Sequence, residues 1–305
     1  MEKILTEEEK IKRIAEVTVF RGSYEDTPEN REVYIPEGIE EIAENAFRDF
    51  KNLAVVHLPR SLKRISAAAF CGCEALTSVD MPFGVEEILD EAFSSCPMLS
   101  VVNMPDSVKR IGEGAFEGCA SLSKLRLSEA VYMIGASAFA FCFNLRDVVI
   151  PDSCILVEFN AFASCFSLES VKLSCNMGLI DESTFEGCRS LAVVDMPVRL
   201  TRIGRRAFFG CSSLRAVILP HGVREIGLDA FAGCSSLARI AIPKGVRTLE
   251  DEEVFNSCDS LVEISYGGSR EGWELLTHGK SLTVMRSDLT YYTPRVLFLD
   301  LKDEI

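Results

Sequence analysis

The chain has 305 residues with 32 Lys and Arg against 46 Asp and Glu, which gives a formal net charge of −14. A chain this acidic lacks the cations that neutralise a phosphate backbone, so nucleic acid is excluded as the expected partner. Hydrophobic residues make up 48% and charged residues 26%, a balance typical of globular proteins. No apolar run approaches the roughly 18 to 20 residues of a membrane span.

Residues 1–33 are predicted to cap one end of the fold. Thr6 and Glu9 have the spacing of a helix capping box, Ile11 and Ile14 would line the inner side of a short helix, and residues 17–20 read as a strand. Glu and Lys interrupt this segment throughout, so it does not resemble a signal peptide. As written, the chain is expected in the cytoplasm. An upstream signal in the native gene would instead indicate export or a cell-surface location.

A repeat of 23 residues occupies residues 34–264. Aligned copies read (I/L/M)-P-x-x-V-x-x-I-x-x-x-A-F-x-x-C-x-x-L-x-x-V-x, and the tenth copy ends one residue late. The recurrent Phe residues are Phe47, Phe70, Phe93, Phe116, Phe139, Phe162, Phe185, Phe208, Phe231 and Phe255. A unit this short cannot enclose its own apolar face, so we expect neighbouring units to stack and share one core.

Each unit contains three predicted pieces, illustrated by residues 76–96. Residues 76–82 alternate apolar and polar side chains near their end, which predicts a strand with one buried face that Pro82 terminates. Residues 85–88 carry two apolar side chains spaced by three and predict a second short extended piece. Residues 91–96 have a helical or 3₁₀ spacing.

This pattern resembles the leucine-rich repeat subclass of BspA-like bacterial proteins, whose units have the form IPxxVxxIGxxAFxxCxxLxxV. The likeness covers all ten units, with local departures such as Ser128 and Ser174 in place of Pro. The resemblance implies an α/β repeat fold, a right-handed curved leucine-rich repeat solenoid with a parallel β-sheet and short helical or 3₁₀ turns. It also implies bacterial interaction proteins, many of them exported or surface-attached adhesins.

Residues 265–305 are predicted to cap the other end. We expect a short helix around Trp273 that ends near Gly279, with Trp273 buried in the cap, followed by strand-like runs at 282–285 and 296–301. Residues 278–281 read His-Gly-Lys-Ser like the end of a P-loop, but Glu274 stands where that motif requires its first Gly. No nucleotide site is therefore predicted.

The twelve Cys residues are expected to be reduced. Nine occupy one repeat position: Cys73, Cys96, Cys119, Cys142, Cys165, Cys188, Cys211, Cys234 and Cys258. Parallel side chains about 4.8 Å apart on stacked strands neither suit a disulfide nor converge on zinc, so a buried row of thiols is predicted. Cys71 and Cys175 stand where other units carry polar residues and are expected to be exposed, and a redox role there would need a lowered thiol pKa.

The sequence predicts a non-catalytic protein without a cofactor. Catalysis needs unlike groups converging on one point, whereas translation by one repeat places like residues beside like. Three hypotheses stay open. They are an interaction scaffold for a protein or other macromolecule, a host-directed or cell-surface adhesin of the BspA-like type, and a thiol-dependent redox protein or enzyme with an unrecognised site.

Two surfaces are candidates for binding the unknown partner. The first comprises outward residues of the predicted sheet, namely the basic Lys124, Arg126 and Lys172 and the apolar Val193, Ala216 and Ile218. The second comprises Phe141, Phe143, Phe159 and Phe166, in positions that other units fill mostly with small or charged residues. Phe143 and Phe166 lie one period apart and should stack. Exposed aromatic groups are typical of interfaces, including self-association, although neighbouring side chains or loops covering them is the alternative.

Overall fold

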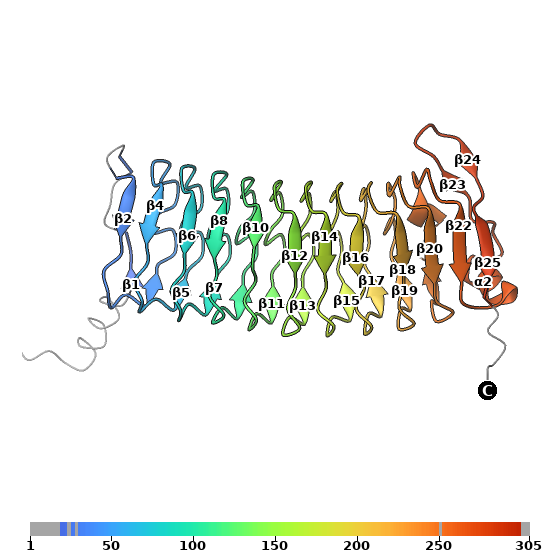
Figure 1. Cartoon of the computed structure of the whole chain (residues 1–305), viewed down its shortest axis with the longest axis horizontal. Helices are drawn as coiled ribbons and strands as arrows, with labels where there is room; N and C mark the ends of the chain where they lie inside the picture. Colours follow the sequence, from blue (N-terminus) through green and yellow to red (C-terminus); the bar gives the residue numbers. More distant parts are fainter. Residues whose placement is uncertain (1–18, 23–25, 28–29, 250–251, 300–305) are drawn as a thin grey trace, which may run out of the picture.

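The structure is a computed structural model that describes residues 19–22, 26–27, 30–249 and 252–299. The predicted capping box at Thr6 and Glu9 and the helix around Ile11 and Ile14 lie outside these residues. The described coils form one continuous row along the long axis of the molecule (Figure 1). The predicted repeat solenoid with parallel strands is therefore confirmed.

Strands of two to four residues form one side of the row, here called the long-strand face (Figure 1). Most of the three-residue strands bury their central residue, while the two outer residues are exposed or half-buried. Pairing is parallel with equivalent residues in register, as for Val79 and Val102. The strands are β2 Glu32–Tyr34, β4 Val55–His57, β6 Ser78–Asp80, β8 Val101–Asn103, β10 Lys124–Leu125, β12 Asp147–Val149, β14 Ser170–Lys172, β16 Val193–Asp195, β18 Ala216–Ile218, β20 Arg239–Ile242, β22 Glu263–Tyr266 and β25 Arg295–Phe298. They divide into sheets ordered β10-β8-β6-β4-β2, β12-β14-β16 and β18-β20-β22-β25.

Two-residue strands form a second side, here called the short-strand face. The first residue of each faces outward and the second is buried, as expected for the second extended piece of the repeat. The strands are β1 Val19–Phe20, β3 Glu41–Ile42, β5 Arg64–Ile65, β7 Glu87–Ile88, β9 Arg110–Ile111, β11 Met133–Ile134, β13 Leu156–Val157, β15 Leu179–Ile180, β17 Arg202–Ile203, β19 Glu225–Ile226 and β21 Thr248–Leu249. One sheet runs from β1 to β13 and another from β15 to β21.

Hydrogen-bonded turns around the recurrent Phe form the third side, here called the turn side. The Phe47 N–H donates to the carbonyl of Ala69 in the next coil at 2.7 Å, and later coils repeat this bond. In most coils the residues two before and two after the Phe have positive φ, as at Glu91 (55°) and Ser95 (57°). These left-handed residues prevent a continuous 3₁₀ helix. Within the described ranges, a 3₁₀ helix forms only at η1, Glu252–Phe255.

The core is a stack of Phe rings that runs from coil to coil. The ten recurrent Phe residues are fully buried, and neighbouring rings stack with centroids 5.1 to 6.1 Å apart. The predicted row of Cys residues lies beside them, with all nine thiols buried. Each Sγ donates to the Phe carbonyl of the preceding coil, as from Cys73 to Phe47 at 3.2 Å. This bond satisfies the thiol inside an apolar interior.

Two of the departures from the repeat have a local explanation. Ser128 and Ser174 replace Pro and are fully buried. The Ser128 hydroxyl accepts the Ala130 N–H at 3.1 Å, and the Ser174 hydroxyl accepts the Asn176 N–H at 3.2 Å. Such a bond holds a turn in place of the fixed φ that Pro supplies in the other coils.

The end of the described chain covers the last coil. Ser269 caps α2, Arg270–Leu276, by accepting the Gly272 N–H at 3.2 Å. Trp273 is buried and packs on Tyr266 with ring centroids 5.3 Å apart, which confirms it as a buried cap residue. β23 Val284–Met285 and β24 Tyr291–Tyr292 pair antiparallel, and β25 extends the sheet of β22.

Candidate partner-binding surfaces

The predicted basic group on the long-strand face is exposed but divided. Lys124 belongs to β10, the last strand of its sheet, whereas Lys172 belongs to β14 in the next sheet. Arg126 follows β10 and donates from Nη2 to Asp106 at 2.9 Å. That hydrogen bond lowers the pKa of the Asp106 carboxyl and raises the pKa of Arg126. Arg126 is therefore engaged within the chain, and Lys124 and Lys172 do not form one continuous basic patch.

The predicted apolar stretch also lies on the long-strand face. Val193 is 62% exposed and Ile218 is 77% exposed, and Ala216, in the same strand as Ile218, is exposed as well. Val193 ends up in β16 and the other two in β18, strands that belong to different sheets. Val149, exposed in β12, pairs in register with Lys172. Apolar and charged groups are thus interspersed on this face without a regular order.

Three of the four predicted aromatic residues meet on the turn side. Phe143 and Phe166 stack with centroids 4.8 Å apart and planes 9° apart, which confirms their predicted stacking. Phe141 meets Phe143 edge-on at 6.3 Å. The guanidinium of Arg189, one coil further on, lies 4.6 Å from the centre of the Phe166 ring. These four residues form a ridge across three coils, held by stacking and cation–π contact.

Phe141 has a strained backbone. Its φ is 61°, in the left-handed region, where a bulky residue is unusual. Gly118 and Gly187 adopt the same conformation at the equivalent position with φ of 71° and 73°, at no side-chain cost. An L-residue in this region costs about 1 to 2 kcal/mol.

Phe159 lies in a different setting from the other three aromatic residues. It lines a hollow with Glu182, Glu186 and Arg206, and Arg206 pairs with Glu186 at 2.8 Å. The sequence predicted one surface that contains both Phe159 and Phe143, but the fold separates the two residues. Phe159 precedes the recurrent Phe of its coil, whereas Phe143 follows the recurrent Phe of its coil.

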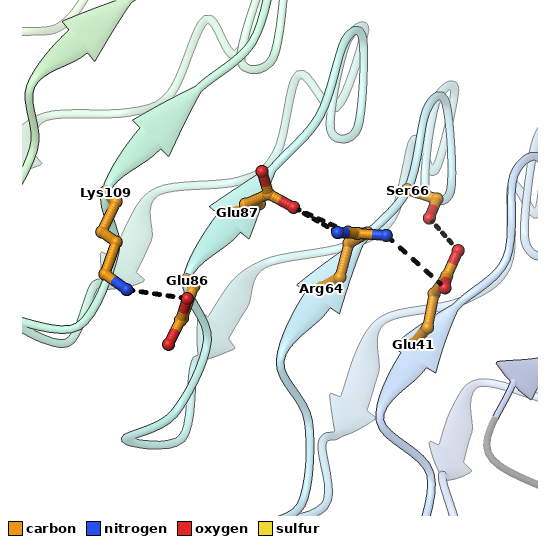
Figure 2. A network of polar contacts seen from close by, with 6 residues as sticks. All are labelled: Glu41, Arg64, Ser66, Glu86, Glu87 and Lys109. Atoms are coloured by element: carbon orange, nitrogen blue, oxygen red, sulfur yellow. Dashed lines mark hydrogen bonds and ion pairs between the residues drawn. The ribbon is translucent and has the colours of Figure 1, made fainter.

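The short-strand face carries a ladder of alternating charges that the sequence analysis did not identify. Figure 2 shows Arg64 between Glu87 and Glu41, at 2.7 and 4.0 Å, with Lys109 on Glu86 at 2.8 Å. The Lys109 hydrogen bond lowers the pKa of the Glu86 carboxyl. In each pair the partners occupy equivalent positions of adjacent coils, so the repeat itself sets the contact.

An exposed apolar cluster interrupts this ladder. Tyr132 and Ile155, the residues just before β11 and β13, are 45% and 63% exposed. Leu156 is also exposed and pairs in register with the half-buried Met133. We call these four residues the apolar patch. The signal was present in the sequence, since the outward positions carry Glu or Lys/Arg in the four preceding coils and change to apolar residues here.

Comparison with known protein families agrees with the repeat pattern. The sequence profile of the BspA type leucine rich repeat region matches residues 18–146 and 133–262, which together make up more than half of the chain. The chain belongs to the BspA-type leucine-rich repeat family. The resemblance read from the repeat is thereby confirmed.

Several solved bacterial structures are similar to this BspA-type protein. A leucine-rich repeat protein from Bacteroides ovatus is 25% identical, with 88% of this chain and 83% of that chain covered and a TM-score of 0.49. A leucine rich cell surface protein from Faecalibacterium prausnitzii is 30% identical, with 82% of each chain covered and a TM-score of 0.49. The T. pallidum leucine-rich repeat protein is 27% identical, with 61% and 78% covered and a TM-score of 0.46. Among curated proteins, none matches the chain.

Of the three cysteines outside the row in this BspA-type protein, Cys71 departs from the expectation and Cys175 follows it. Cys71 is buried, so its predicted exposure is wrong. Short side chains at this position, such as those of Ser94 and Ala140, are buried as well, because they do not reach the surface. Burial raises the pKa of the Cys71 thiol. Cys175 is exposed as expected, but its hydrogen bond with Asp152 raises its pKa. Both shifts oppose the lowered pKa that a nucleophilic thiol needs.

In the part of the chain that the structure describes, no group of three or more His, Cys, Asp or Glu side chains is placed to hold a metal ion. None of the helices in the described ranges has the length and apolar character that a membrane crossing requires.

Proposed function

We propose that this BspA-type repeat protein is a non-catalytic scaffold that binds a protein through its long-strand face. The observation that carries the proposal is the contrast along this face. The central strand residues stay apolar and mostly buried in every coil, whereas the exposed residues beside them change from coil to coil. Because the exposed residues vary while the buried residues stay constant, this surface is suited to recognise one particular partner.

Exposed apolar side chains support this assignment. Val149, Val193 and Ile218 project from three different strands, while Lys172 and Arg239 supply positive charge nearby on the same face. Apolar groups surrounded by charged ones match the composition of protein interfaces, where a few desolvated side chains provide most of the affinity. Asp147 and Asp195 supply negative charge on the same face, so a protein partner with an apolar projection flanked by charges of both signs fits this surface.

The test is quantitative capture from cells of the native organism. The immobilised chain is compared with a variant carrying Val193→Ser and Ile218→Ser, and with the control Val198→Ser, which is 77% exposed in the turn after β16. Recovery of a specific protein should fall severalfold with the double variant and stay constant with the control. Equal recovery by all three chains would contradict the proposal.

The aromatic ridge is the other candidate surface, and the same capture separates the two. A chain with Phe143→Ser and Phe166→Ser removes the stacked pair without touching the long-strand face. Loss of the captured protein with this variant alone would assign recognition to the turn side instead.

A cell-surface adhesin is the second candidate function, because the F. prausnitzii relative is described as a cell surface protein. Antibody labelling of intact cells tests it. Labelling that equals that of permeabilised cells would place the protein outside, whereas labelling only after permeabilisation would exclude this candidate.

A further inference from the structure

The apolar patch and the charge ladder lie on the short-strand face, away from the surface assigned to a partner above. We propose that this face joins two copies of the chain. The copies pack with their coil rows antiparallel, about a two-fold axis that passes between β11 and β13. Tyr132 and Met133 of each copy then lie opposite Ile155 and Leu156 of the other.

The charges on either side of the patch support a second copy as the occupant. Equivalent outward residues lie in register within each of the two sheets of this face, β1 to β13 and β15 to β21. Rotation about the proposed axis places β7 opposite β17 and β5 opposite β19 of the second copy. Glu87 then faces Arg202, and Arg64 faces Glu225, so both contacts join opposite charges.

These contacts would extend ion pairs that each copy already forms. Arg64 pairs with Glu87 at 2.7 Å, and Arg202 pairs with Glu225 at 3.4 Å. Laid against each other in antiparallel order, the two pairs alternate in sign both along and across the interface. A network of several charges is worth more than an isolated surface pair.

The positions just before the strands give one contact of opposite charge, one of like charge and two in which a charged residue meets an uncharged one, as Glu86 meets Thr201. Glu40 falls opposite Arg247, and Lys109 falls opposite Gly178, where no side chain obstructs it. Lys63 falls opposite Arg224, a pair of like charge, but the Arg224 guanidinium donates to its own His221 and Val223 carbonyls at 2.9 and 3.0 Å. The Arg224 guanidinium is therefore held against a turn of its own copy.

The other face-to-face dimer is unfavourable. With parallel coil rows each coil meets its own copy, so Glu40 and Glu41 would face the same two glutamates and Lys63 and Arg64 the same two cations. Like charges opposed over several coils disfavour that orientation. Charge alone therefore selects the antiparallel arrangement.

The test measures the mass of the full chain in solution by analytical ultracentrifugation. We expect twice the chain mass of 33.7 kDa for the wild type. Ile155→Lys places an unpaired charge in the apolar centre and should raise the dissociation constant at least about tenfold. Val262→Lys, at an exposed valine just before β22, is the matched control and should leave the dimer intact.

A charge exchange tests the orientation. Glu87→Arg and Arg202→Glu should each weaken the homodimer, since each creates two like-charge contacts. In an equimolar mixture, the heterodimer joins the arginine introduced at position 87 of one variant to the glutamate introduced at position 202 of the other. It keeps the original contact between Glu87 and Arg202 on the other side of the axis, so both contacts again join opposite charges and a heterodimer should form. This rescue also shows that both variants fold.

Three results would overturn the proposal. They are a monomeric wild type, an Ile155→Lys variant that dimerises like Val262→Lys, and a mixture that stays as weak as its components. Partner capture by Val193 and Ile218 is a separate measurement, so failure of the proposed function would leave the dimer test unchanged.

Discussion

Replacing one ring of the buried Phe stack should destabilise the whole fold, and Phe93→Leu is the sharpest case. Phe93 is fully buried, and its ring stacks on Phe70 at 5.1 Å and on Phe116 at 5.3 Å. Each stacked aromatic pair contributes about 0.5 to 1.5 kcal/mol beyond its buried area, so removing both costs about 1 to 3 kcal/mol. Leu also fills less of the site, which adds about 1 to 2 kcal/mol.

Phe83 offers a control within the same repeat unit. It is 81% exposed in the turn before β7, so Phe83→Leu should change the free energy of unfolding by no more than about 0.5 kcal/mol. Urea unfolding followed by circular dichroism gives both values. The substitution leaves the Phe93 carbonyl in place to accept the hydrogen bond from Cys119 Sγ, so a loss of stability reports on the ring. A cost below about 1 kcal/mol for Phe93→Leu would refute the view that the stacked rings hold the coils together.

Two further predictions concern ionisable groups. Of the twelve cysteines, Cys175 should be the one that reacts with Ellman's reagent in the folded protein, and slowly because its pKa is raised, while the other eleven react only after denaturation. Rapid release of more than one equivalent of chromophore would show that the thiol row is accessible. Burial raises the pKa of Tyr292, whose hydroxyl donates to the Cys258 carbonyl at 2.6 Å, to about 12. The unfolded chain ionises this group near the ordinary value of 10.0, so stability should fall as the pH rises from about 10 to about 12. Tyr292→Phe should remove that part of the pH dependence, and an unchanged slope would contradict the assignment.

The repeat period predicted the interior well because translation along the coils fixes which side chains point inward. The stacked Phe rings and the buried Cys row both follow from the 23-residue spacing. Ser128 is tolerated at the Pro position of the repeat, because the hydrogen bond that its hydroxyl accepts replaces the constraint that Pro supplies. An interior position has equivalent neighbours in every coil. The repeat motif therefore predicts the burial of that position in all coils.

Exterior positions were harder to predict because their surroundings depend on side-chain length. Cys71 was expected in solvent from the polar residues at its position, but it is buried there, as are the short side chains of Ser94 and Ala140 in other coils. Phe159 was grouped with Phe143 by residue type, although the two lie on opposite sides of the core Phe in their units. The divisions of the long-strand sheet after β10 and after β16 have no counterpart in the repeat pattern.

The apolar patch within the charge ladder has a physical consequence for the proposed dimer. A ladder that alternated without a break, as Glu41, Arg64, Glu87 and Arg110 do, would be complementary to itself at every shift of two coils. Two copies could then slide between several registers of similar energy. The apolar patch occurs once on this face of the described coils, and only one antiparallel register buries it against itself. Charge therefore selects the orientation, and the patch selects the register, in the way that a hydrophobic pattern fixes strand pairing.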